Sequence, residues 1–286
     1  MSDLRPGPIN PAKAGPWGAA GDPAPARARA RKRAGRAIED ENPSQNLIWA
    51  LVSTALLAGL LWWLMGWVYA LAGIVGLLVH EYGHVLAMNR LGMGPARIYI
   101  IPFLGGAARG ARGAASEWIG VLVSLAGPAF GLIAALPFFA VWAVTGDPVW
   151  LQGAWFVAII NLLNLAPAPP LDGSKALGPV LARVHPLLEK AALLGIGALV
   201  VVWGLQNGAY ILAIFLALGV FSHLRRGAWR PDTAPLSWSQ AGASLGLFLT
   251  TGAACAAVGL TAMALYTGDG PGAALATSGR FLGITS

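Results

Sequence analysis

Seven long apolar stretches follow one another along most of this chain, and they constrain its fold more than any other feature. They occupy residues 46–67, 68–91, 118–144, 149–165, 187–205, 209–224 and 241–266. Each spans or nearly spans a hydrocarbon core, which needs about 20 helical residues. The boundary between the first two stretches is weak, so the chain has six spans or seven, and we favour seven. We therefore predict an all-α polytopic membrane protein.

The composition agrees with this prediction. The chain is 56% hydrophobic and only 11% charged, whereas a soluble globular protein is usually about 45–50% apolar and about 25% charged. So few polar residues cannot cover the surface of a soluble fold of this length. The single cysteine, Cys255, excludes an intramolecular disulfide.

The first 45 residues differ sharply from the rest, because they are rich in Pro, Ala, Gly and Arg and contain a basic run at 26–36. No periodic apolar face can be drawn there, so we predict a disordered basic arm. Such an arm can bind nucleic acid, but ahead of a membrane span it more simply favours cytoplasmic retention and attraction to anionic lipid. We therefore expect a lipid bilayer and no nucleic acid as partner. The first apolar stretch also begins too late for a cleavable signal peptide.

Basic residues in the loops give the orientation. With the arm inside, the loops after even-numbered spans are cytoplasmic, and these loops hold nearly all the basic residues. They are Arg90, Arg97, Arg109, Arg112, Lys175, Arg183, Lys190, Arg225, Arg226 and Arg230. The positive-inside rule thus places the N-terminus in the cytoplasm. The Ala/Gly/Arg-rich composition indicates a GC-rich bacterial source and hence a bacterial plasma membrane.

The second apolar stretch contains the sequence His80-Glu81-Tyr82-Gly83-His84, which is an HExxH motif. On a helix, positions i and i+4 share one face, so both imidazoles can reach one metal ion. Zinc lowers the pKa of a bound water towards about 7, and Glu81 can take the proton during attack on a carbonyl. The alternative is that these groups pair with one another inside a helix bundle, but ionisable groups inside membranes are functional by default.

A catalytic zinc site commonly uses three protein ligands. Candidates for the third ligand on the same side of the membrane are Glu117, Asp172, His185, Glu189 and His223. Asp172 stands out because it follows a Pro-rich segment, 167–171, that cannot continue a helix. Non-helical backbone at membrane depth is tolerated only where it is buried in protein or lines a wet cavity. We predict that Asp172 caps a broken helix beside the HExxH motif, although an Asp-Gly pair is also an ordinary turn.

The HExxH motif and the later sequence Asn164-x-x-Pro167-x-Pro169-x-Leu171-Asp172-Gly173 together resemble the site-2 protease family of intramembrane zinc metallopeptidases. The resemblance covers roughly 68–175, the three-span catalytic core of that family.

The resemblance implies a role for each of these residues. His80, His84 and Asp172 would bind zinc, and Glu81 would be the catalytic acid and base. Asn164, with Pro167 beside it, would help to hold the substrate.

Residues 97–106 look like the hydrophobic, Gly-Gly-containing loop that follows the HExxH helix in this family. We predict a strand or hairpin there, whose exposed edge can pair with an unwound substrate by strand addition. Gly105 and Gly106 are accordingly candidate substrate-binding residues. Gly127-Pro128 is similar to a Gly-Pro element of the family, but it can equally be a re-entrant loop or a kink at a helix-packing site.

We expect five segments along the chain. They are a disordered arm at 1–45, a first span at 46–67, a metalloprotease core at 68–175, C-terminal transmembrane helices at 176–266 and a flexible tail at 267–286. No sequence resembling a PDZ domain interrupts the core, and none resembling a nucleotide-binding domain follows it. The chain looks like a compact member of the family.

These features predict an intramembrane zinc metalloprotease that cuts single-pass membrane proteins within or near the transmembrane segment, releasing for example a membrane-held regulator. The alternative is a metal or ion transporter or a substrate-binding pseudoprotease. A transporter also places His and Asp on broken helices, but it would not need Glu81, whose presence argues against a dead enzyme as well. Substrate identity and oligomeric state stay open.

Overall fold

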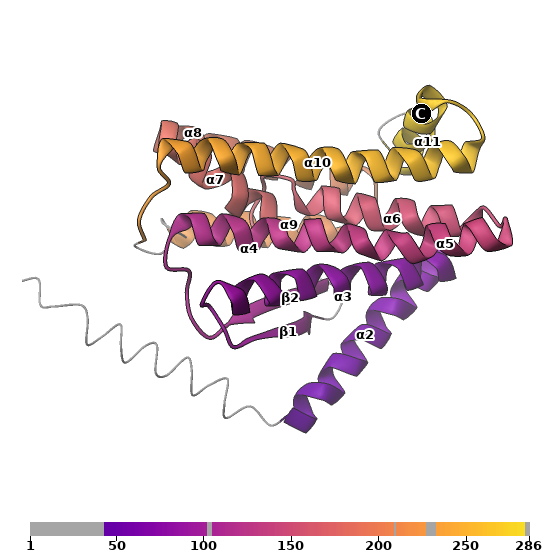
Figure 1. Ribbon diagram of the computed structural model, residues 1–286, viewed down its shortest axis with the longest axis horizontal. Helices are drawn as coiled ribbons and strands as arrows, with labels where there is room; N and C mark the ends of the chain where they lie inside the picture. The colour runs from indigo at the N-terminus through magenta and orange to yellow at the C-terminus, as the bar shows by residue number, and fades with distance from the viewer. Residues whose placement is uncertain (1–42, 102–104, 209, 227–232, 284–286) are drawn as a thin grey trace, which may run out of the picture. The chain divides into compact units, whose positions relative to one another are not determined.

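The computed structural model describes residues 43–101, 105–208, 210–226 and 233–283 (Figure 1). The predicted basic arm lies outside the described residues, apart from its last few. The helices are α2 (Pro43–Met65), α3 (Trp67–Arg90), α4 (Glu117–Gly131), η2 (Leu132–Ala135), α5 (Leu136–Thr145), α6 (Val149–Asn164), α7 (Asp172–Val184), α8 (Pro186–Gln206), α9 (Tyr210–Arg226), α10 (Trp238–Thr267) and α11 (Pro271–Phe281). The strands are β1 (Ala96–Ile101) and β2 (Gly105–Gly110).

The predicted all-α polytopic membrane protein is confirmed. Within the described residues, four helices are long and apolar enough to cross a membrane: Trp67–Arg90, Glu117–Thr145, Pro186–Gln206 and Trp238–Thr267. Three shorter apolar segments accompany them: Ala50–Met65 within α2, Val149–Asn164 and Ala213–Leu224 within α9. The choice between six and seven spans stays a prediction, because these apolar segments fall below the length that a perpendicular span needs.

The weak boundary between the first two apolar stretches is a break between two helices. Gly66 separates α2 from α3 with φ at 106° and ψ at 170°, a backbone conformation that is essentially restricted to glycine. The helix cannot run through this residue, so α2 and α3 are separate elements.

The interior lies where α3, α4, α6 and α10 meet. In Figure 1, α3 lies on one side of α4 and α10 on the other, and α3 and α10 both also pack against α6. Small residues let the helices approach: a methyl group added at Gly83 would lie 2.7 Å from Phe130 Cβ, and one at Gly76 would lie 3.3 Å from a methyl of Val157. Glycine therefore sets the close spacing of the helix that carries HExxH, as is common between membrane helices.

The predicted hairpin after the HExxH helix is confirmed. Strands β1 and β2 are antiparallel, with Arg97 opposite Arg109 and Ile101 opposite Gly105. Asn89, in the last turn of α3, anchors the hairpin because its Oδ1 accepts a hydrogen bond of 3.0 Å from the amide of Ala96. The hairpin is thereby fixed to the end of the HExxH helix.

The predicted break before Asp172 is also present. Helix α6 ends at Asn164, irregular turns follow, and α7 begins at Asp172. The backbone approaches so closely here that a Cβ at Gly173 would overlap the carbonyl oxygen of Leu165. Asp172 differs from the expected capping residue in one detail: Leu171 is the N-cap, and Asp172 lies in the first turn. A carboxylate in the first turn is favoured by the helix dipole.

The segment 267–286, for which we expect a flexible tail, contains a further helix. Helix α11 occupies Pro271–Phe281 and buries Ala274 and Ser278, which are four residues apart and therefore share one face. The Nε1–H of Trp155 on α6 donates a hydrogen bond of 3.1 Å to Ser278 Oγ. This polar contact and the packing of α11 on α10 hold the segment in place.

Candidate metal centre

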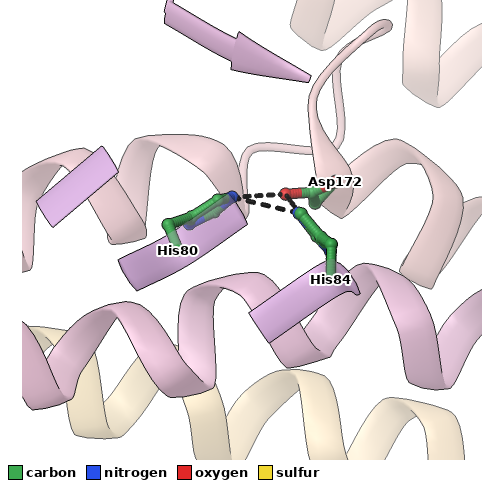
Figure 2. A group of neighbouring side chains, drawn as sticks. All are labelled: His80, His84 and Asp172. Carbon is green, nitrogen blue, oxygen red and sulfur yellow. Dashed lines mark hydrogen bonds and ion pairs between the residues drawn. The ribbon is translucent and has the colours of Figure 1, made fainter. Parts of the chain in front are cut away.

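His80, His84 and Asp172 come together inside the helix bundle (Figure 2). Each is buried, with 2%, 6% and 7% of its surface exposed respectively. Asp172 Oδ2 lies 3.1 Å from His80 Nε2 and 3.1 Å from His84 Nε2, and the two Nε2 atoms lie 3.1 Å apart. The three predicted ligands thus converge on one point from α3 and α7.

Two outer hydrogen bonds fix the tautomers of the imidazoles. His84 Nδ1 lies 2.7 Å from the carbonyl oxygen of Val123, which can only accept, so this nitrogen carries the proton. His80 Nδ1 lies 2.9 Å from Asn161 Oδ1, and Asn161 Nδ2 donates to the carbonyl oxygen of Val157 at 2.8 Å. Because that donation orients the amide, Oδ1 faces His80 and accepts its Nδ1 proton. Both Nε2 atoms therefore present lone pairs to Asp172.

This arrangement fits a zinc ion. Three electron-pair donors that face one another at 3.1 Å repel unless a cation or a shared proton lies among them. Tetrahedral zinc with bonds of about 2.0–2.1 Å places neighbouring ligand atoms about 3.3 Å apart. Two imidazole nitrogens and one carboxylate oxygen are also a donor set that zinc accepts. His80, His84 and Asp172 accordingly form a site with the chemistry of a metal centre.

The second oxygen of Asp172 faces a cation. Lys175 Nζ lies 3.6 Å from Oδ1, one helical turn further along α7. The positive charge of Lys175 favours the ionised carboxylate, which is the form that binds a metal.

Gly127 on α4 keeps the space beside the ligands open. A Cβ at this position would lie 2.8 Å from His80 Nε2 and nearer still to His84 Nε2. The Gly-Pro element of the sequence is therefore a place where the backbone of α4 approaches the metal centre.

Replacing Gly127 by Ala is accordingly expected to lower bound zinc from one ion per chain to a small fraction, since the methyl group displaces both donor atoms. Elemental analysis of the purified chain checks this. Gly120→Ala is the matched control, because the added methyl group at this α4 position meets nothing within 4 Å. Full zinc content in the Gly127 variant would contradict the assignment.

Glu81 lies beside the centre on α3 and is 5% exposed. Its Oε2 has no hydrogen-bond partner among the described residues. A buried carboxylate oxygen without a partner is costly, so this oxygen suits a group that enters the site from outside, such as a water or a substrate amide.

The predicted substrate-binding residues lie at the end of α6, in the turns that follow it, and at the start of β2. Asn164, at the end of α6, is half-buried and donates from Nδ2 to the carbonyl oxygen of Ile160 at 3.1 Å. Pro167 lies in the turns that follow, and Gly105 and Gly106 open β2. Their role in binding substrate stays a prediction.

The other candidate third ligands do not join the centre. Glu117, for example, accepts a hydrogen bond of 3.0 Å at Oε2 from the amide of Leu236 and so ties α4 to the segment before α10. Sequence reasoning missed Asn161, which contacts His80 directly. An amide in the middle of the apolar run 149–165 was the available signal, because a buried polar group needs a partner.

Comparison with known proteins agrees with this geometry. Residues 68–148 match the sequence model described as peptidase family M50. This segment, which contains the HExxH helix and the hairpin, is thus similar to family M50. The matched segment contains HExxH but ends before Asp172. Only the structure therefore shows that Asp172 lies beside the two histidines of this motif.

Curated relatives carry matching names. "Putative zinc metalloprotease Rip3" of Mycobacterium tuberculosis is 29% identical over 175 residues, which cover 58% of this chain and 42% of that protein. "Putative zinc metalloprotease sll0528" of Synechocystis sp. is 28% identical over 159 residues, covering 50% of this chain and 41% of that protein. The match thus spans about two fifths of each relative's length. No solved structure matches the chain.

Proposed function

We propose that this chain is an intramembrane zinc metalloprotease that hydrolyses a peptide bond within or near the transmembrane segment of single-pass membrane proteins. The observation that carries the proposal is the group of His80, His84 and Asp172, buried among apolar helices with their donor atoms 3.1 Å apart. The M50 core and the names of the relatives support the same activity.

His80 and His84 would hold zinc through Nε2, and Asp172 through Oδ2. When bound, zinc would supply Lewis-acid polarisation of the scissile carbonyl and increase the acidity of the attacking water. The protein contributes the fixed positions of the donor atoms, because the outer hydrogen bonds to Val123 and Asn161 hold both rings.

Glu81 would move the proton. Its carboxylate accepts a proton from the water as the oxygen attacks the peptide carbonyl carbon, and then donates this proton to the nitrogen of the leaving amine. The C–N bond breaks, and the products are a new carboxyl group and a new amino group. The oxygen Oε2, which has no partner among the described residues, is the atom we assign to this transfer.

A substrate helix must unwind before it is cut, because a helical carbonyl is already hydrogen-bonded and sterically shielded. The hairpin offers partners for the freed backbone: β1 and β2 form a two-stranded sheet within the described residues, and an added strand can pair at its edge. We assign Gly105, Gly106, Asn164 and Pro167 to this binding step. The cytoplasmic face of a bacterial plasma membrane is the proposed location.

Asn164→Leu is expected to raise KM for a single-pass substrate about tenfold, corresponding to one lost hydrogen bond of about 1.4 kcal/mol, with little change in kcat. Initial rates at varied substrate concentration in detergent measure both constants. A fall in kcat at unchanged KM would assign Asn164 to the chemical step instead.

The direct test is to reconstitute the purified chain with single-pass membrane proteins in liposomes and to identify the products by mass spectrometry. We expect a cut within or near the transmembrane segment. Transport of zinc across the liposome membrane without any peptide cleavage would support the transporter, and binding of substrates without cleavage would support the pseudoprotease. Either outcome would overturn the proposal.

A further inference from the structure

We propose that Asn161 is a positioning residue that holds His80 in the tautomer and ring orientation required to bind the metal. This inference rests on the metal centre of the proposed function and does not depend on which peptide bond, if any, is cleaved.

Asn161 connects the metal centre to the backbone of α6. It has no exposed surface, and its Oδ1 lies 2.9 Å from His80 Nδ1. At the other end of the amide, Nδ2 donates to the carbonyl oxygen of Val157 at 2.8 Å. A rotation of the amide by 180° would place Nδ2 against His80 and Oδ1 against a carbonyl, so only one orientation satisfies both partners.

The backbone of α4 holds this amide in place from the opposite side. A Cβ at Gly131 would overlap Asn161 Oδ1 and lie 2.7 Å from both Cγ and Nδ2. The amide is therefore enclosed between the start of the η2 turn and α6, and the absence of a side chain at residue 131 makes the room for it. Gly131 therefore contributes to the position of Asn161, and through Asn161 to that of His80.

The two imidazoles depend on different kinds of acceptor. His84 donates to the backbone carbonyl of Val123, which no side-chain substitution removes. His80 donates to a side chain, so its tautomer depends on the identity of residue 161. If that acceptor is lost, the buried Nδ1–H has no partner, and a proton on Nε2 becomes competitive. A proton there occupies the lone pair that the metal needs.

The test measures zinc affinity of the full chain in detergent by competition with a chromophoric chelator. We expect Asn161→Leu to bind zinc about 10–100-fold more weakly, the usual effect of losing a partner of a metal-bound histidine. Asn161→Asp keeps an acceptor oxygen and is expected to restore most of this loss. Gly131→Ala, which displaces the amide without changing any ligand, is expected to weaken zinc binding in the same way as Asn161→Leu.

Asn164→Leu is the matched control, because it removes the same kind of side chain one turn further along the same helix. Its amide bonds to the carbonyl oxygen of Ile160, and zinc affinity is expected to remain that of the wild type. Size-exclusion elution and thermal unfolding of each variant establish that it is folded.

A second readout distinguishes positioning from packing. The chain contains four histidines, so the ¹⁵N chemical shifts of their rings can be assigned with single-residue variants. We expect the metal-free wild type to show the proton of His80 on Nδ1, and Asn161→Leu to show a mixture of tautomers. Wild-type zinc affinity and an unchanged tautomer in Asn161→Leu would overturn the inference, as would an equal loss of affinity in a folded Asn161→Asp. If the wild type binds zinc but cleaves no peptide, the proposed function fails while this inference stands.

Discussion

Replacing Glu81 by Gln is expected to lower kcat for peptide cleavage by about 10²–10⁴-fold, the usual contribution of a general acid and base. The amide keeps the volume of the carboxylate but cannot accept the proton of the attacking water. Glu81 is also not one of the three grouped ligands, so the variant is expected to keep its zinc. Single-turnover cleavage of a single-pass substrate, with elemental analysis of the same sample, measures both effects.

Tyr82→Phe is the control for this experiment. Tyr82 is the next residue of α3 but is 55% exposed, so it points away from the buried centre, and we expect wild-type cleavage. Undiminished cleavage by Glu81→Gln would contradict the proposed mechanism. Loss of both cleavage and zinc in this variant would instead make Glu81 a structural part of the metal centre.

The second large effect is expected for the ligands. A triple variant, with His80, His84 and Asp172 each changed to Ala, should lose its zinc completely, because all the grouped donor atoms are removed. The single variant Asp172→Ala should also hold far less zinc than the wild type, since two neutral imidazoles alone leave the charge of the cation unbalanced. The measurement is zinc per chain after dialysis at a defined free zinc concentration.

His185→Asn is the control for the ligand variants. His185 is exposed, and it caps α8 by accepting a hydrogen bond of 3.1 Å at Nδ1 from the amide of Leu187. Asn keeps a capping acceptor, so a change in zinc content would not be expected. An unaltered zinc content in the triple variant would contradict the assignment of His80, His84 and Asp172 as ligands.

Parts of this site could be predicted from the sequence because their geometry is local. The spacing of His80 and His84 determines their common face once the segment is helical. Asp172 could be predicted because proline forbids a continuous helix through 167–171, and a break at membrane depth must lie in protein or beside water. A strand or hairpin at 97–106 was predictable from its place after the HExxH helix in the resembling family.

Other parts depend on packing that the sequence does not reveal. The contact between Asn161 and His80 joins residues 81 positions apart and requires a defined rotation of α6 against α3. Glycine at residue 131 has a function only because Asn161 lies opposite it. The sequence contains both residues but gives no sign of their proximity.

Helix α11 was not predicted, for a different reason. Its sequence, PGAALATSGRF, is short and rich in small and polar residues, so composition favoured a flexible tail. The helix is held by tertiary contacts, including the hydrogen bond from Trp155 to Ser278. Helical stability in proteins generally comes from such packing rather than from intrinsic propensity.

The most direct test of the central account is the metal dependence of cleavage in liposomes. The purified chain is stripped of metal with a chelator, incubated with a single-pass membrane protein, and then supplied with zinc, while mass spectrometry follows the products. The account predicts a cut within or near the transmembrane segment that disappears on chelation and returns with zinc. Cleavage that continues at the same rate in the metal-free protein would contradict a zinc centre built from His80, His84 and Asp172.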